Sequence, residues 1–178
     1  NSRECMEDLK RAGIKHLVLL SGDSQEIVDE VAKELGIEFA FGQLLPEDKL
    51  NKIEEIYKDN PEVKIAFVGD GINDAPVLAR ADLGIAMGGV GQDAAIEAAD
   101  MVLMTDELSK IVDGISIAKF TRQIVMENII FALFVKAFVL LLVVCGISSM
   151  WMAVFADVGV SLIAVINSIR VYRYKLKR

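Results

Sequence analysis

Residues 67–76 read Phe67-Val68-Gly69-Asp70-Gly71-Ile72-Asn73-Asp74-Ala75-Pro76. The apolar run that starts at Ile65 predicts a buried strand, so Asp70 would leave its carboxyl end and Asp74 would open the next helix. Ligands of open α/β sheets bind at this edge, and carboxylates are the hard oxygen ligands that Mg²⁺ prefers. An acidic helix start without a metal is the alternative. The complete Gly-Asp-Gly-x-Asn-Asp-Ala-Pro run favours a Mg²⁺ site for phosphoryl transfer.

The residues around this stretch alternate between strand and helix patterns. Strands are predicted at 15–20, 39–42, 65–68, 83–87 and 101–104, and helices at 2–12, 25–35, from 46 onward, 75–79 and 94–98. Such alternation is typical of one parallel, doubly wound sheet. We therefore predict an α/β domain over residues 1–105.

Two further groups follow predicted strands. Ser21-Gly22-Asp23 combines a hydroxyl with a glycine, and Ser24 can cap the helix that follows, which suits a phosphate-binding turn. A capped turn without a ligand is the alternative. Lys49 lies in the first turn of a helix, where the dipole disfavours a cation, so we expect it to neutralise a phosphoryl group. A solvated lysine is the alternative there, and His16 is expected to be a packed strand residue.

Charge separates the chain into two parts. Residues 1–110 carry a net charge of −12 and residues 111–178 one of +5, which together give the −7 of the whole chain. The acidic part argues against a nucleic-acid partner, because phosphate backbones require a basic face. Cys5 and Cys145 do not suggest a disulfide framework, so a reducing compartment is expected. The chain begins inside a helix-like run without an initiator Met, as a fragment would.

The second part predicts a pair of transmembrane helices. Nothing breaks a helix between Thr105 and Gly146, a length of roughly 60 Å, about twice a bilayer core. We expect a cytoplasmic stalk helix over 106–123, spans over 124–146 and 150–171, and a basic cytoplasmic tail over 172–178. Trp151, Tyr172 and Tyr174 would mark the two membrane interfaces. The positive-inside rule then places residues 1–123 and 172–178 in the cytoplasm.

Two ionisable residues lie within the predicted spans. Counted from the turn at residues 148–149, Asp157 and Lys136 lie at depths of about 12 and 18 Å, a gap that a lysine stem can bridge. Placing either ionisable side chain at such a depth costs about 3 kcal/mol, so we expect the two residues to form an ion pair. A carboxylate suits Zn²⁺, and the ammonium can keep the site neutral once the metal has left. A purely structural ion pair is the alternative, and Cys145 is expected to be a packing residue.

These motifs, in their order, resemble the C-terminal part of a P-type ATPase of the heavy-metal branch. Residues 1–110 are similar to the later half of its haloacid-dehalogenase-like phosphorylation domain, a Rossmann-like α/β fold. The Asp157-Val158-Gly159 run, with Lys136 in the preceding span, resembles the zinc, cadmium and lead exporters. The resemblance implies an ATP-driven exporter of Zn²⁺, Cd²⁺ or Pb²⁺ in the plasma membrane that works through a Mg²⁺-dependent aspartyl-phosphate. Its partners would be the lipid bilayer, the remaining domains of the pump and the metal cations.

The resemblance also implies residue roles. Ser21, in the loop with Gly22 and Asp23, would bind a phosphoryl oxygen, and Lys49 would stabilise its charge. Asp70 would bind Mg²⁺, while Asp74 would hold Asn73 and the magnesium waters in place. Asp157 would bind the transported ion, with Lys136 as its counter-charge. Ser21 stands where Thr is commoner, which retains the hydroxyl.

Other motifs of such pumps are missing from the chain. It has no Asp-Lys-Thr-Gly-Thr, Thr-Gly-Glu or Cys-Pro-Cys run, so we expect that it forms no aspartyl-phosphate by itself and that ATP binds mainly to other parts. Two alternatives are a membrane-tethered phosphatase of the same superfamily and a non-catalytic membrane subunit. Neither explains Lys136 and Asp157 as well as transport does.

Overall fold

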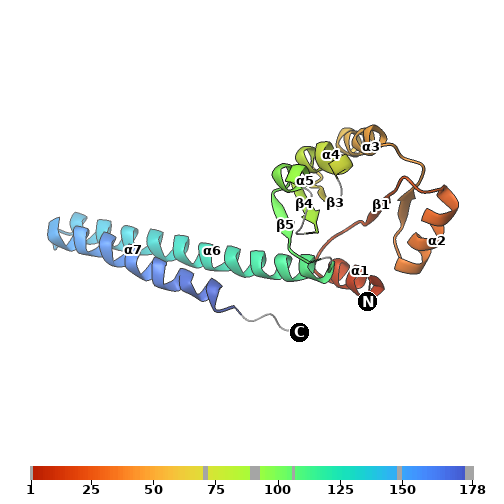
Figure 1. The fold of residues 1–178 in the computed structure, drawn as a ribbon. Helices are drawn as coiled ribbons and strands as arrows, with labels where there is room; N and C mark the ends of the chain where they lie inside the picture. Colours follow the sequence, from red (N-terminus) through yellow and green to blue (C-terminus); the bar gives the residue numbers. More distant parts are fainter. Residues whose placement is uncertain (1, 70–71, 89–92, 106, 148–149, 175–178) are drawn as a thin grey trace. The chain divides into compact units, whose positions relative to one another are not determined.

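A computed structural model describes the chain except for residues 1, 70–71, 89–92, 106, 148–149 and 175–178 (Figure 1). The chain divides into two compact units, Asn1–Val112 and Asp113–Arg178.

The first unit alternates helices with short parallel strands, as the sequence pattern predicts (Figure 1). Its elements are α1 (Ser2–Arg11), β1 (Val18–Leu20), α2 (Gln25–Leu35), β2 (Phe39–Phe41), α3 (Pro46–Asp59), β3 (Ala66–Gly69), the 3₁₀ turn η1 (Ile72–Asp74), α4 (Ala75–Arg80), β4 (Leu83–Met87), α5 (Asp93–Ala98) and β5 (Met101–Leu103).

The described strands form two parallel sheets rather than the one sheet expected. β1 pairs with β2, with Val18 opposite Phe39, and the second sheet has the order β3-β4-β5, with Val68 opposite Ile85. β1 and β3 each have one strand neighbour among the described residues, so each leaves a hydrogen-bonding edge unpaired. Val18 is 40% exposed, although the pattern predicts a buried strand.

Helix α4 packs closely on β4. Leu78 and Ala86 are buried at the centre of this contact, with Phe67 and Val102 packed around them. A side chain at Gly84 would place its Cβ 2.4 Å from the carbonyl oxygen of Leu78, so only glycine permits this approach. Full burial of Leu78 contributes about 2 kcal/mol to stability.

Two local expectations are wrong. Ser24 stands at the N-cap of α2 with an extended backbone, but its side chain makes no capping bond; its carbonyl accepts the N–H of Val28 instead. His16 lies before β1, not in it, because pairing with β2 begins at Val18. Its imidazole is exposed, 4.0 Å from the carboxylate of Glu38 and edge-on to the ring of Phe39.

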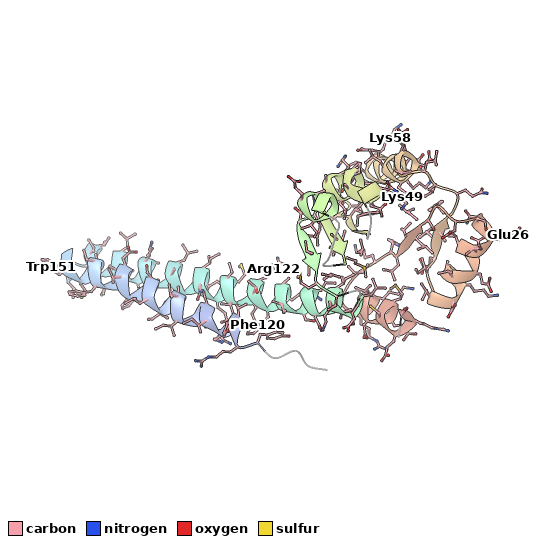
Figure 2. All side chains as sticks on the ribbon, in the orientation of Figure 1. Glu26, Lys49, Lys58, Phe120, Arg122 and Trp151 are labelled. Carbon is pink, nitrogen blue, oxygen red and sulfur yellow. The ribbon has the colours of Figure 1, made fainter. Side chains whose placement is uncertain are left out.

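The second unit is a hairpin of two long helices, α6 (Ser109–Val144) and α7 (Met150–Tyr172), which lie side by side (Figure 1). Both are long and apolar enough to cross a membrane, which confirms the predicted helical hairpin. α6 starts at Ser109, later than the expected Thr105, and runs unbroken toward Gly146, whose φ of 73° ends it in the left-handed region. Trp151 lies at the turn end of the hairpin, and Phe120 and Arg122 lie toward its other end (Figure 2).

Candidate functional site

A buried ion pair joins α3 to the start of α4. The Nζ of Lys49 lies 2.8 Å from Oδ1 of Asp74, and the two side chains are only 18% and 10% exposed. Asp74 is the buried charged residue among those described. The ammonium of Lys49, expected to face a phosphoryl group, therefore rests on a carboxylate of the neighbouring motif.

The backbone around Gly69 brings Asp74 to this place. β3 ends at Gly69, and a Cβ there would lie 2.9 Å from Cβ and 3.0 Å from Oδ2 of Asp74. Asp74 is the N-cap of α4, as predicted, with Pro76 in the first turn. Its side chain makes no capping hydrogen bond, because the carboxylate is directed to Lys49 instead.

A second set of contacts holds α3 against the end of α4. Arg80 forms an ion pair with Glu54, with Nη2 2.9 Å from Oε2, and lies over the ring of Tyr57 at 4.6 Å. The Tyr57 hydroxyl donates to Asp82 at 2.7 Å. These contacts fix the helix that carries Lys49. No local sequence pattern predicts these contacts, because each joins residues far apart in the chain.

Asp82 is the centre of this set. Its carboxylate accepts hydrogen bonds from Lys64 Nζ at 2.8 Å, from the N–H of Ile65 at 3.0 Å and from Tyr57. The bond from Lys64, followed by those from Ile65 and Tyr57, holds the pKa of Asp82 well below its usual range. Desolvation by burial and then the carboxylate of Asp82 raise the pKa of Tyr57.

The Ser21 hydroxyl makes its hydrogen bonds within its own loop. Ser21 Oγ donates to Asp23 Oδ2 at 2.8 Å and accepts the N–H of Asp23 at 3.2 Å. The loop follows β1, in the other sheet from the strand that leads to Asp74. Among the described residues, no hydrogen bond or ion pair joins Ser21, Gly22 or Asp23 to Lys49 or Asp74.

The donors near Asp74 suit Mg²⁺ in their chemistry. Asn73 is exposed in η1 and supplies an amide oxygen, and Asp74 has a second carboxylate oxygen that does not contact Lys49. Both are hard oxygen ligands. Asp70, the predicted magnesium ligand, lies outside the described residues.

A second ion pair links the two helices of the hairpin. Lys136 Nζ lies 3.3 Å from Asp157 Oδ1, which confirms that the lysine stem bridges the gap. The pair lines a groove of about 350 Å³ whose other walls are apolar, among them Val139 and Val160. The described residues contain no group of three His, Cys, Asp or Glu side chains that could hold a metal. Cys145, expected to be a packing residue, is exposed near the end of the hairpin.

Comparison with known proteins defines the class of the first unit. The family model of the haloacid dehalogenase-like hydrolases matches residues 1–82, in agreement with the parallel strands and the acidic turn after β3. The first unit thus has the haloacid-dehalogenase-like fold.

The relatives extend over both units. The chain is 55% identical to a cadmium, zinc and cobalt-transporting ATPase of Bacillus subtilis, over 99% of this chain and 25% of that protein. It is 51% identical to a zinc-transporting ATPase of Synechocystis, over 94% of this chain and 23% of that protein. A crystal structure of a zinc-transporting PIB-type ATPase in the E2.Pi state matches with a TM-score of 0.85 at 37% identity, over 95% of this chain and 27% of that one.

Over nearly its whole length the chain is similar to the family of the cadmium- and zinc-transporting P-type ATPases. It spans about a quarter of the length of the relatives it matches. The matches cover the hairpin as well as the α/β unit, so a tethered phosphatase or a non-catalytic subunit is not favoured. The predicted localisation in the cell membrane, with the α/β unit on the cytoplasmic side, agrees with this family and with the two apolar helices.

Proposed function

We propose that this chain is part of an ATP-driven exporter of heavy-metal cations, in which phosphoryl transfer at the α/β unit is coupled to ion movement along the helical hairpin. The observation that carries the proposal is the Lys136–Asp157 pair between two apolar helices. Ionisable residues are costly inside a membrane and mark ion pathways by default.

In the α/β unit, Lys49 and Asp74 act on the phosphoryl group together. Asp74 holds the ammonium of Lys49 at 2.8 Å, so the cation is already in place when a negatively charged phosphoryl group arrives. Ser21 donates its hydroxyl to a phosphoryl oxygen once it releases Asp23. Asp70 would hold Mg²⁺, with Asn73 and Asp74 as further oxygen groups beside it. When bound, Mg²⁺ neutralises charge on the phosphoryl oxygens.

In the hairpin, Asp157 is the oxygen ligand for the transported cation. The names of the relatives include cadmium, zinc and cobalt, and a carboxylate oxygen suits Zn²⁺. The ammonium of Lys136 replaces the charge of the metal after its release, so that Asp157 is not left unpaired in the membrane. Further ligands, the nucleophilic aspartate and most of the ATP site come from other parts of the pump.

The test is substitution in the full-length pump. Asp157→Ala should abolish zinc binding and zinc-stimulated ATP hydrolysis, whereas Lys136→Ala should retain binding and slow turnover. Ser161→Ala is the matched control, because Ser161 lies one turn from Asp157 and its hydroxyl donates to the Asp157 backbone carbonyl rather than to the Asp157 carboxylate. Zinc binding by Asp157→Ala at unchanged stoichiometry and affinity would show that the pair is purely structural.

A further inference from the structure

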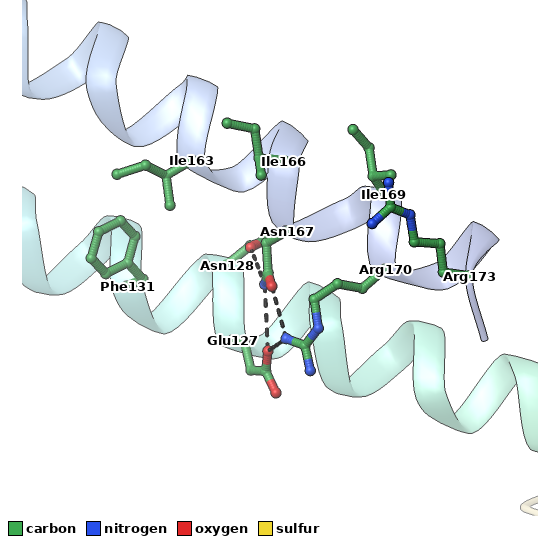
Figure 3. Close-up of a pocket in the computed structure, with 9 residues that line it drawn as sticks. All are labelled: Glu127, Asn128, Phe131, Ile163, Ile166, Asn167, Ile169, Arg170 and Arg173. Atoms are coloured by element: carbon green, nitrogen blue, oxygen red, sulfur yellow. Dashed lines mark hydrogen bonds and ion pairs between the residues drawn. The ribbon is translucent and has the colours of Figure 1, made fainter. Parts of the chain in front are cut away.

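A groove lies between α6 and α7 near the ends that carry the basic residues (Figure 3). Its volume is about 520 Å³. One part is apolar, formed by Phe131, Ile163, Ile166 and Ile169. The other part carries Arg170 and Arg173, together with a polar network that starts at Glu127.

The polar network satisfies its own members. Arg170 Nη1 donates to Glu127 Oε2 at 2.9 Å and to Asn167 Oδ1 at 2.8 Å, and Asn167 Nδ2 donates to Asn128 Oδ1 at 2.9 Å (Figure 3). The charge of Glu127 is thereby neutralised, so this carboxylate does not make the groove a cation site.

Unused donors remain beside the network. Among the described residues, the hydrogen bonds that the Arg170 side chain donates start at Nη1, which leaves its Nε and Nη2 groups available. The guanidinium of Arg173 has no hydrogen-bond or ion-pair partner among the described residues; only its backbone N–H is bonded. Glu127, Arg170 and Arg173 are the charged groups that line the groove, so its net charge is positive.

The polarity of the groove changes along the membrane normal. Arg173 follows the last turn of α7 and precedes Tyr174, whose ring stacks on that of Phe120 with the centroids 4.5 Å apart. Tyrosine at this level is typical of a membrane interface. Ile163 precedes Arg173 by ten residues, and therefore lies about 15 Å deeper. The cationic part thus lies at the cytoplasmic surface and the apolar part in the hydrocarbon.

We propose that this groove binds an anionic phospholipid of the cytoplasmic leaflet. Its phosphate pairs with Arg173 and with the unused N–H groups of Arg170, and its acyl chain lies along Ile163, Ile166 and Ile169. The order of a charged head above an apolar tail matches the groove, and anionic lipids concentrate in this leaflet. A further helix of the pump would cover the isoleucines but would also have to supply an anion to Arg173.

The experiment uses the full-length pump in nanodiscs of phosphatidylcholine with a minor share of phosphatidylglycerol. Native mass spectrometry after mild extraction counts the phosphatidylglycerol molecules that stay bound. Arg173→Gln and the groove-filling Ile166→Trp should each lower retention of one phosphatidylglycerol at least fivefold. Arg173→Lys should retain most of it, and Arg122→Gln is the matched control, because Arg122 is an exposed cation of α6 that does not line the groove. Excess inorganic phosphate should not displace the lipid.

Wild-type retention by both Arg173→Gln and Ile166→Trp would overturn the proposal and would indicate that another part of the pump occupies the groove. Displacement by inorganic phosphate would overturn it as well, because the site would then recognise a free anion. An equal loss of bound phosphatidylglycerol in Arg122→Gln would attribute the effect to surface charge in general. That result would also overturn the proposal. None of these outcomes depends on zinc binding at Asp157.

Discussion

Lys49 and Asp74 form an ion pair of 2.8 Å in a largely buried position, although they come from different motifs and are 25 residues apart. A buried charge is stable only with its partner. The pair therefore has two separable roles, one in the stability of the α/β unit and one in the proposed chemistry.

Lys49→Met should leave the Asp74 carboxylate buried without its cation and destabilise the α/β unit by about 3 kcal/mol. Pulse proteolysis in urea measures this loss. Lys58→Met, on the exposed side of the same helix, should change stability little. The double variant Lys49→Met/Asp74→Asn should regain stability, yet the full-length pump that carries it should not turn over its phosphoenzyme. If the single variant were as stable as the wild type, the pair would have no structural role.

Gly69→Ala should disturb Asp74 directly. The added methyl would lie 2.9 Å from Asp74 Cβ and 3.0 Å from Oδ2, so the carboxylate would have to move away from Lys49. We expect a loss of about 2 kcal/mol by urea denaturation, as for other overpacked sites. Gly22→Ala is the comparison, because its added methyl would make an ordinary contact of 3.4 Å with the Leu44 carbonyl. Equal stabilities of the two variants would contradict the prediction.

Asp82→Asn should weaken the contacts among Tyr57, Lys64 and Asp82 in a pH-dependent way. The folded-state pKa of Asp82 is depressed, so its ionised form stabilises the fold above the unfolded pKa of about 4, and this contribution fades as pH falls through the folded-state value. The difference in urea midpoint between wild type and Asp82→Asn should be largest near pH 7 and shrink toward pH 3. Asp59→Asn, an exposed change on α3, should show no such trend. If the difference in urea midpoint stayed constant with pH, the effect of Asp82→Asn would come from altered packing and not from the lost charge.

Asn167→Leu should loosen the hairpin. Asn167 donates to Asn128 at 2.9 Å and accepts from Arg170 at 2.8 Å, which ties α7 to α6 through side chains. Polar contacts between membrane helices are worth about 1 kcal/mol, so thermal unfolding in detergent should occur at a lower temperature. Val165→Leu, an exposed apolar change on the same helix, should have no effect. An unchanged transition in Asn167→Leu would mean that apolar packing alone joins the helices.

Much of the architecture follows from local patterns. The long helices α6 and α7 are predictable because apolar composition and the absence of breakers act residue by residue. Asp74 at the start of α4 follows from the strand that precedes it. The pairing of Lys136 with Asp157 is also accessible, because the constant helical rise converts sequence position into depth.

Tertiary structure decided the rest. The partner of Lys49, the bonds of Tyr57 to Asp82, and the groove between Phe131 and Ile166 each join residues far apart in sequence. The bond from Ser21 to Asp23 is local, but the sequence does not predict it. A small hydroxyl has several partners within reach, and its rotamer selects one of them. The division into two sheets depends on which strand edges find neighbours. Periodicity shows which face of a helix or strand is apolar. Only packing selects the atoms that contact this face, because each contact depends on the placement of two separate elements.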